Sequence, residues 1–209
     1  TEIGEIPKEW EVKKLGEVGE TYNGLNNKNK DDFGYGKPYI PYKNIFNNSK
    51  VDLNYLEYVN ILETEKQNKV RYGDIFFTVS SETSNELGMA SVLLDEVDEL
   101  YLNSFCFGFR LYNFKTLIPN FARFLLRGEY FRNVISRLAQ GSTRYNLSKN
   151  ELLKILIPIP PLPEQQKIAD ILSTVDEQIE NVDKLIEKTK ELKKGLMQRL
   201  LTKGIGHKE

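Results

Sequence analysis

The sequence predicts an α+β protein, in which a mixed, largely antiparallel β-rich domain is followed by one long C-terminal helix. Between residues 37 and 159, short β-branched and aromatic runs alternate with turn signals such as Gly73-Asp74. A proline-rich segment, residues 157–163, then holds four of the chain's eight prolines. From Ile168 onward, apolar residues recur at alternating steps of four and three, which is the spacing of a coiled-coil seam.

The β-rich runs predict strands and one helix within the first domain. The expected strands cover residues 39–42, 75–79, 89–94, 101–111 and 155–157. A helix is expected from Pro119, a residue suited to a first turn, to just before Gly141. Its apolar positions have helical spacing and predict a face turned to the core. Beside this stripe Arg123, Arg127 and Arg137 would project together, either as a solvated face or as a phosphate-contacting one.

The prolines predict where the chain changes from one part to the next. Proline has a fixed φ and no backbone N–H, so this segment favours neither a helix interior nor a central strand. The sequence therefore predicts a globular domain over residues 1–157, a junction over 158–163, a long helix over 164–203 and a short tail over 204–209.

Length and composition fit one sizeable core with an appendage. The chain has 209 residues, of which 40% are hydrophobic and 28% charged. No apolar run is long enough to cross a bilayer and the first residues lack signal-peptide features, so we expect a cytoplasmic protein with no membrane contact. The one cysteine, Cys106, lies in an apolar run, which predicts a buried thiol rather than a disulfide.

A net charge of −1 conceals a segregation of charge along the chain. Residues 110–154 contain nine Lys or Arg and two acids, whereas residues 82–100 contain six acids and no base. Such blocks predict a basic surface on a nearly neutral protein, and a basic surface is compatible with nucleic acid.

The motifs of common enzymes are missing. The one histidine, His207, lies near the end of the sequence, which argues against histidine-dependent triads and zinc sites. Gly34-Tyr35-Gly36 lacks the third glycine of a dinucleotide loop, and there is no Walker-type Gly-Lys-Ser. We therefore expect no catalytic residues, no metal site and no cofactor in this chain.

Two polar loops are candidates for DNA contact. Residues 141–148 carry small hydrogen-bonding residues with one cation and one aromatic ring, and Arg suits guanine whereas Asn suits adenine. The same residues also fit a helix end at Gly141 followed by a cap at Ser148. A second loop, residues 23–30, fits either a surface turn or a finger that probes a groove.

The long helix requires a partner for its apolar seam. About 40 residues extend roughly 60 Å as a helix, too far to bury the seam against one compact domain. Residues 164–183 contain six acids and one base, and residues 184–203 contain seven bases and two acids. Antiparallel pairing of two copies would place the acidic half of one helix beside the basic half of the other. The helix macrodipole also favours acids near the start and bases near the end, but its effect fades beyond the terminal turns. The predicted dimer interface consists of Ile168, Leu172, Val175, Ile179, Val182, Ile186, Leu196 and Leu200.

Several segments together resemble the specificity subunits of type I restriction-modification systems. The opening, residues 6–18, resembles the Pro-x-x-Trp and Leu-Gly pattern that begins a target-recognition domain of that family. Residues 40–45, 73–77 and 101–104 resemble its recurrent strand motifs. Gly141-Ser142-Thr143 and the junction at residues 160–165 are similar to the end of its domain and the start of its conserved helix.

This resemblance implies a non-catalytic subunit that reads double-stranded DNA. It further implies methyltransferase subunits that bring S-adenosylmethionine and modify adenine, together with a restriction and translocase subunit. A typical member carries two recognition domains and two spacer helices, whereas this sequence has one of each, as a half-subunit or a fragment would. Two chains paired head to tail would act as a ruler for a split, palindromic target. The expected DNA-contacting residues are Lys43, Asn44, Arg123, Arg127, Ser142, Thr143, Arg144, Tyr145 and Asn146.

Two other interpretations remain open from the sequence. One is a coiled-coil assembly module whose globular head binds protein instead of DNA. The other is a recognition domain detached from a polypeptide that combines nuclease and methyltransferase.

Overall fold

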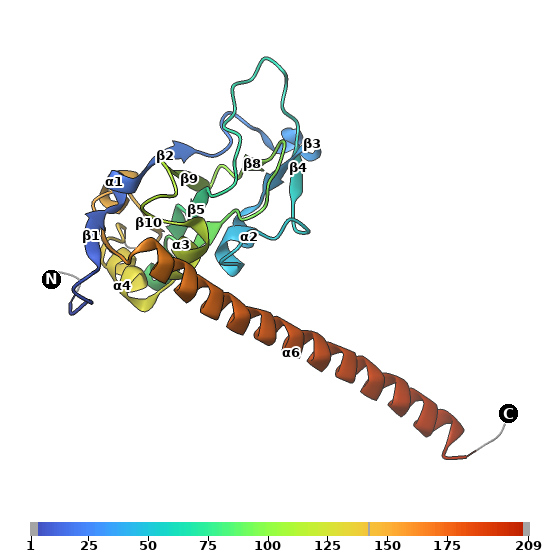
Figure 1. Cartoon of the computed structure of the whole chain (residues 1–209). Helices are drawn as coiled ribbons and strands as arrows, with labels where there is room; N and C mark the ends of the chain where they lie inside the picture. Colours follow the sequence, from blue (N-terminus) through green and yellow to red (C-terminus); the bar gives the residue numbers. More distant parts are fainter. Residues whose placement is uncertain (1–3, 142, 207–209) are drawn as a thin grey trace. The chain divides into compact units, whose positions relative to one another are not determined.

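The structure is a computed structural model that describes residues 4–141 and 143–206. The chain divides into two units, residues 1–168 and residues 169–209. The first unit is built around an antiparallel sheet with the strand order β2-β9-β5-β7, and Figure 1 shows β2, β9 and β5 side by side. These strands are β2 (Gly19–Asn23), β5 (Ile75–Thr78), β7 (Ala90–Val92) and β9 (Cys106–Leu111).

Strand β5 forms the centre of the core. All four of its residues are buried, because β5 lies between two strands and is covered on both faces. Successive side chains of a strand point to opposite faces. On one face, the ring centroid of Phe77 lies 6.2 Å from that of Phe131 in α4 (Glu129–Arg137). On the other face, Phe76 joins a buried cluster with Ile40 of β3 (Phe33–Ile40) and Ile45 of α2 (Tyr42–Asn47).

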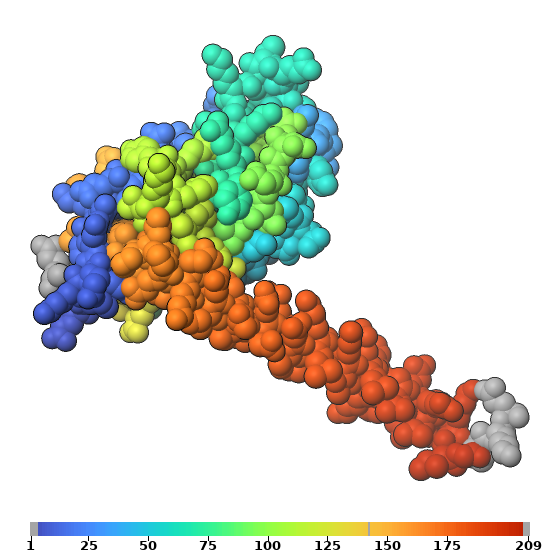
Figure 2. Space-filling view, viewed as in Figure 1, coloured from blue at the N-terminus to red at the C-terminus, as the bar shows by residue number. Residues whose placement is uncertain are grey.

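A second sheet has the order β4-β3-β8, with β3 antiparallel to β4 (Glu57–Val59) and parallel to β8 (Tyr101–Leu102). Tyr39, Val59 and Tyr101, one from each strand, form a buried cluster with Leu25. Residues 60–70, which follow β4, form a projection of the surface of this unit, drawn in teal in Figure 2. The mixed and antiparallel sheets confirm the predicted α+β class.

Two further strand pairs and four short helical segments complete the first unit. Strand β1 (Glu11–Lys14) pairs with β11 (Leu156–Ile159), and β6 (Ser80–Ser81) pairs with β10 (Tyr145–Asn146), both antiparallel. Pro158 lies inside β11, where a two-stranded sheet leaves an edge that tolerates proline. The short helical segments are α1 (Leu15–Val18), η1 (Lys30–Asp32), η2 (Ser84–Glu86) and α5 (Lys149–Leu152).

The single helix expected after Pro119 is in fact two helices, α3 (Pro119–Leu125) and α4. They are separated because Gly128 has an extended backbone, with φ −64° and ψ 153°, and precedes the first turn of α4. The prediction of one row of arginines on one helix was therefore wrong. The apolar stripe does face the core, since Phe121, Phe131 and Ile135 are buried.

The strands predicted over residues 101–111 and 39–42 differ from those in the structure. The strand predicted over residues 101–111 is interrupted between β8 and β9, where the backbone N–H of Cys106 bonds to the carbonyl of Asn103 at 3.2 Å. The strand predicted over residues 39–42 ends at Ile40, and α2 begins at Tyr42. The break between β8 and β9 and the end of β3 at Ile40 both lie close to the candidate interface.

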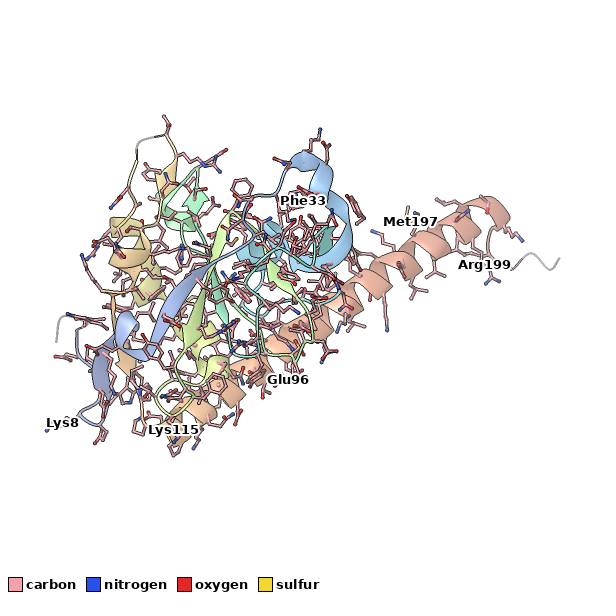
Figure 3. The ribbon with its side chains drawn as sticks, turned by 90° about the horizontal axis from the view of Figure 1, so that it is seen from above. Lys8, Phe33, Glu96, Lys115, Met197 and Arg199 are labelled. Atoms are coloured by element: carbon pink, nitrogen blue, oxygen red, sulfur yellow. The ribbon has the colours of Figure 1, made fainter. Side chains whose placement is uncertain are left out.

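Helix α6 (Leu162–Lys203) has 42 residues and begins two positions earlier than expected. Pro163 fits its first turn, where a backbone N–H is not required. Within the second unit, the seven seam residues from Leu172 to Leu200 are each between 37% and 55% exposed, while Ile168 in the first unit is half-buried. Figure 3 shows side chains around α6, with Met197 and Arg199 labelled. No helix in the described part of the chain is both long and apolar enough to cross a membrane.

Candidate nucleic-acid interface

A short hairpin presents the polar loop that follows α4. Asn146 donates its backbone N–H to the carbonyl of Gln140 at 2.8 Å, and Gln140 returns the bond at 3.2 Å. Gly141 has a φ of +123°, and a Cβ at this position would lie 2.2 Å from the carbonyl oxygen of Arg144. Because only glycine fits there, the hairpin holds Thr143 and Arg144 at an exposed tip.

Tyr42 joins this hairpin to the start of α2. Its hydroxyl donates to the carbonyl of Ser80 in β6, the strand that pairs with β10, at 3.0 Å. Burial raises the pKa of Tyr42, and the positive charge of Arg144 acts against that rise. Arg144 is therefore within electrostatic reach of Tyr42, and Lys43 is the next residue along α2.

Five of the expected DNA-contacting residues belong to this one surface. Lys43, Thr143, Arg144 and Asn146 are exposed and Tyr145 is half-buried. Ser142, the sixth candidate of the same region, lies outside the described residues. We call the surface formed by residues 42–43 and 143–146 the hairpin face; it is backed by the buried residues 80–81. It offers two cations, hydroxyl groups and an amide, which are the groups that contact phosphates and base edges.

Asn44 lies beside the hairpin face but is completely buried. Its Nδ2 donates to the carbonyls of Asp52 at 2.8 Å and Tyr55 at 2.7 Å, while its Oδ1 accepts the backbone N–H of Asp52 at 3.0 Å. These bonds fix the loop that follows α2. The prediction that Asn44 contacts DNA is corrected, because the side chain is inaccessible and its donors and acceptor are used within the protein.

Arg127 also serves the fold. Its Nε donates to the carbonyl of Ala90 at 2.6 Å, and its Nη2 donates to the carbonyls of Ile45, Phe46 and Asn48 at 2.8, 3.0 and 2.8 Å. A cation at the end of α2 satisfies carbonyls that have no partner within the helix. Burial lowers the pKa of Arg127 to about 10. The predicted phosphate contact is corrected, since the guanidinium points into the protein.

Arg123, the second arginine predicted to contact phosphate, is only 8% exposed. Its guanidinium carbon lies 4.3 Å from the ring centroid of Phe124. A side chain at this depth cannot reach a DNA backbone without a rearrangement of α3. The prediction for Arg123 is corrected for the same reason as that for Arg127.

Two more members of the basic block have structural roles. Arg132 donates to the carbonyls of Gly88, Asn85 and Leu87 at 2.8, 2.8 and 2.6 Å. Arg110 forms a 2.6 Å ion pair with the buried carboxylate of Asp74. The basic block therefore does not form one continuous surface, because much of its charge stabilises loop carbonyls and a buried acid.

Lys149 and Phe105 lie close in the chain or by backbone bonding to the strands of the hairpin face, and the sequence interpretation assigned neither to DNA. Lys149 donates to Oδ1 of Asn23, at the end of β2, and its Nζ lies 5.4 Å from the ring centroid of Phe107. Burial lowers the pKa of Lys149. Phe105 is 61% exposed, although it belongs to the apolar run that contains the buried Cys106. The preceding Asn103-Ser104 pair, typical of a turn, is the signal that could have separated it from the strand.

The second candidate loop, residues 23–30, is fixed by residues 65–68. Asn26 and Gln67 exchange two hydrogen bonds of 3.1 and 2.9 Å, and Lys28 forms a 2.5 Å ion pair with Glu65. The Lys28 side chain is only 3% exposed. The loop is therefore a surface turn that hydrogen bonds hold in place. Lys28 is paired with Glu65 and is not available to contact phosphate.

Acidic residues limit the extent of the hairpin face. Burial is the main cause of the raised pKa of Tyr42, and the negative charge of Glu86 in η2 adds to it. Its Oε2 accepts the Thr83 hydroxyl at 2.8 Å. A phosphate backbone would be repelled by Glu86 and attracted by Lys43 and Arg144, which predicts a DNA path on the side of the two cations.

The described residues contain little that suits catalysis. No group of three or more His, Cys, Asp or Glu side chains among them is arranged to hold a metal ion. Cys106 is buried as predicted, and burial raises the pKa of its thiol well above the ordinary value. A neutral buried thiol is a poor nucleophile.

Comparison with known proteins finds one family over most of the chain. Residues 7–191 match the type I restriction modification DNA specificity domain. A type I restriction enzyme MjaX specificity subunit of Methanocaldococcus jannaschii is 36% identical over 98% of this chain and 48% of its own length. The MjaVIII specificity subunit of the same organism is 30% identical over 97% of this chain and 48% of its own length. The chain thus spans about half the length of these relatives.

The fold is shared with solved structures of the same kind of protein. The S subunit of a type I restriction-modification system from M. genitalium superposes with a TM-score of 0.62, over 96% of this chain and 49% of that one, at 20% identity. At this level of identity the likeness concerns the fold alone.

Proposed function

Because the chain belongs to the family of type I restriction-modification DNA specificity domains, we propose that it reads one half of a split double-stranded DNA target. It contributes no chemistry itself. Methyltransferase subunits that carry S-adenosylmethionine dock on it and modify adenine, and a restriction and translocase subunit joins the assembly. The observation that carries this proposal is the family match over residues 7–191, which includes both the hairpin face and most of α6.

The hairpin face supports the DNA-reading part of the proposal. Arg144 and Asn146 are the proposed base contacts, since their side chains suit guanine and adenine in the major groove. Lys43 and Lys149 supply charge for phosphates on either side, and Thr143 and Tyr145 complete the polar surface. The proposed set replaces Asn44, Arg123 and Arg127 with Lys149, because those three serve the fold.

The apolar seam of α6 supports pairing of two chains. Ile179 and Val182 are 55% and 53% exposed. Seam residues occupy α6 from Leu172 to Ile186 and again at Leu196 and Leu200, with Thr189 and Lys193 at the register positions between them. Antiparallel pairing brings the acidic half of one helix against the basic half of the other. Each exposed ion pair contributes at most about 1 kcal/mol, but the parallel arrangement would place like charges together along the whole interface.

The length of α6 then sets the spacing of the two readers. Its 42 residues span roughly 60 Å, which is less than two turns of B-DNA at about 34 Å per turn. We expect two short half-sites separated by a fixed, unread spacer. The target is palindromic when both chains are identical.

The family match argues against the two other interpretations of the sequence. A coiled-coil module with a protein-binding head accounts for α6 but not for a match that begins at residue 7. A domain detached from a combined nuclease and methyltransferase lacks support from the relatives, whose names are those of specificity subunits.

Binding measurements on the purified chain test the DNA-reading proposal. We expect affinity for duplex DNA to fall steeply with salt, and Lys43→Gln to flatten the slope of log K against log salt by about 0.9. Lys115→Gln is the matched control, since this exposed lysine, labelled in Figure 3, follows the far end of β9. Salt-independent binding, or equal effects of both substitutions, would contradict the proposed surface.

Co-purification and a distance measurement test the assembly. The proposal requires that the chain co-purify with a methyltransferase subunit. Spin labels on a cysteine placed at the exposed Lys167 should lie roughly 45–50 Å apart in an antiparallel dimer and roughly 10–15 Å apart in a parallel one. Cys106 is 2% exposed and does not compete for the label.

A further inference from the structure

Phe105 is an exposed aromatic side chain that the core does not use. It lies between β8 and β9 and is 61% exposed, more than any other phenylalanine among the described residues. Its neighbours along the chain behave differently, since Cys106 and Phe107 are 2% and 1% exposed. A single exposed apolar side chain is common at a protein surface, so its significance depends on the residues that lie beside it.

The backbone of Phe105 is firmly held. Its N–H donates to Oδ1 of Asn103 at 2.8 Å, and its carbonyl accepts the N–H of Val79 at 3.1 Å. Cys106 donates its N–H to the carbonyl of Asn103 at 3.2 Å. The ring is therefore presented by an ordered turn, and a contact made by it requires little ordering of the main chain.

The same hydrogen bonds place Phe105 at the hairpin face. Val79 bonds to Phe105 through its N–H, and its carbonyl accepts the N–H of Leu147 at 2.9 Å. Val79 thus lies between Phe105 and the strand that carries Tyr145 and Asn146. Ser80 follows Val79 directly and pairs with Asn146. The backbone of Phe105 is accordingly connected through Val79 to the strand that carries the residues proposed to read base edges.

Two other exposed aromatic residues lie at the opposite end of β9. Tyr112 and Phe114 follow Leu111, at the opposite end of β9 from Cys106. Phe114 also has an aromatic neighbour of its own, since its ring centroid is 5.8 Å from that of Tyr72 in an edge-to-face arrangement. Phe105, by contrast, precedes Cys106 at the other end of β9 and is bonded to Val79, the residue before β6.

We propose that Phe105 is a specificity-determining residue that contacts the C5-methyl group of a thymine in the half-site. This inference rests on the proposed DNA-reading function. A phenyl ring has no hydrogen-bonding group, and the apolar feature that distinguishes one base from another in the major groove is the thymine methyl. Arg144 and Asn146 read hydrogen-bonding edges, and Phe105 adds an apolar reading beside them.

The test combines a protein change with the removal of one methyl group from DNA. The probe is a duplex that carries the motif methylated in cells expressing this chain with its methyltransferase, with each thymine replaced in turn by deoxyuridine. At one thymine, the wild-type complex should lose about four-fold in affinity, as expected for one buried methyl group. Phe105→Ala should lose a similar factor on the unmodified duplex and should not respond to that replacement.

Two controls show whether the effect of Phe105→Ala is specific to this ring and independent of folding. Tyr112→Ala removes a ring that is 60% exposed at the far end of β9, and it should leave both affinity and the response to deoxyuridine unchanged. Thermal unfolding of Phe105→Ala should match that of the wild type, because the ring is not part of the core.

Three results would overturn the inference. They are a half-site without thymine, a wild-type complex indifferent to every deoxyuridine, and a Phe105→Ala complex that responds as the wild type does. Equal losses on all duplexes would indicate a ring inserted between bases instead of one that reads a methyl group. If the wild type does not prefer the motif over a scrambled duplex, the proposed function itself fails.

Discussion

Gln165, in the first turn of α6, bonds through its side chain to the backbone around Ile118, which is 47 residues away in sequence. Its Oε1 accepts the N–H of Ile118 at 3.0 Å, and its Nε2 donates to the carbonyls of Thr116 and Pro160, each at 2.8 Å. Gln165 is completely buried. In the same turn Glu164 accepts the indole N–H of Trp10 at 3.0 Å. The first turn of α6 is thereby fixed within the first unit.

Replacement of Gln165 by Leu should destabilise the first unit by about 2 kcal/mol. The apolar side chain would leave the N–H of Ile118 and two buried carbonyls without their partners. Chemical denaturation measures the change. Gln166→Leu makes the same change at the neighbouring exposed position and should alter the free energy of unfolding by less than about 0.5 kcal/mol. Equal effects of the two substitutions would mean that the bonds of Gln165 contribute no net stability.

Asp74 ties three strands together from a buried position. Its carboxylate accepts Nε and Nη2 of Arg110 at 2.8 and 2.6 Å, the hydroxyl of Tyr22 at 2.6 Å and the N–H of Arg71 at 2.9 Å. Asp74→Asn should cost about 2–3 kcal/mol, because the half-buried guanidinium loses its countercharge.

The control for Asp74 is an exposed ion pair. Lys50 and Asp95 are 3.2 Å apart, with both side chains about 40% exposed. Asp95→Asn should change the free energy of unfolding by no more than about 1 kcal/mol. A cost for Asp74→Asn as small as that of the control would contradict the structural role given to the buried carboxylate.

The lowered pKa of Glu99 predicts that the stability of the fold depends on pH in the acidic range. Lys37, Lys69 and Tyr101 lower the pKa of Glu99 to about 2 from an ordinary value of 4.5. Because the folded-state pKa is depressed, this stabilisation is fully present above about pH 5 and is lost as the pH falls toward 2. The difference in melting temperature between the wild type and Glu99→Gln should therefore shrink steadily between pH 5 and pH 2. A difference that is constant across this range would show that Glu99 does not titrate as described.

Substitution in the seam of α6 should abolish pairing. Ile179→Asp places an unpaired charge in the predicted interface and should weaken dimerisation by about 100-fold or more. Asn181→Asp introduces the same charge two positions away, on another side of the helix, and should leave the dimer intact. Sedimentation equilibrium distinguishes the two outcomes. A wild-type chain that remains monomeric at high concentration would contradict the proposal that two paired α6 helices set the spacing between the half-sites.

The sequence was informative wherever a local pattern determines the structure. The buried run around Phe76 and Phe77 and the apolar face of Phe131 and Ile135 followed from periodicity, as did the length of α6. The burial and the hydrogen-bond partners of individual polar residues could not be predicted from periodicity. Arg127 meets carbonyls from residues 45–48 and from Ala90, and no pattern near position 127 indicates that these segments converge there.

Asn44 and Phe105 illustrate the same limit from opposite directions. Asn44 looked available for DNA but is buried by a loop that its own side chain fixes. Phe105 belongs to an apolar run within a predicted strand, but it is exposed at a turn that interrupts that strand. In both positions the outcome depends on contacts between distant segments, which composition and spacing do not encode.

The most direct test of the central claim is the methylome of a cell that expresses this chain with its methyltransferase subunit. If two identical chains read DNA head to tail, the modified adenines will lie in a palindromic motif of two short half-sites with a fixed spacer. Insertion of one heptad into α6 should lengthen that spacer without changing the half-sites. A continuous or asymmetric motif, or a spacer that ignores the length of the helix, would contradict the account.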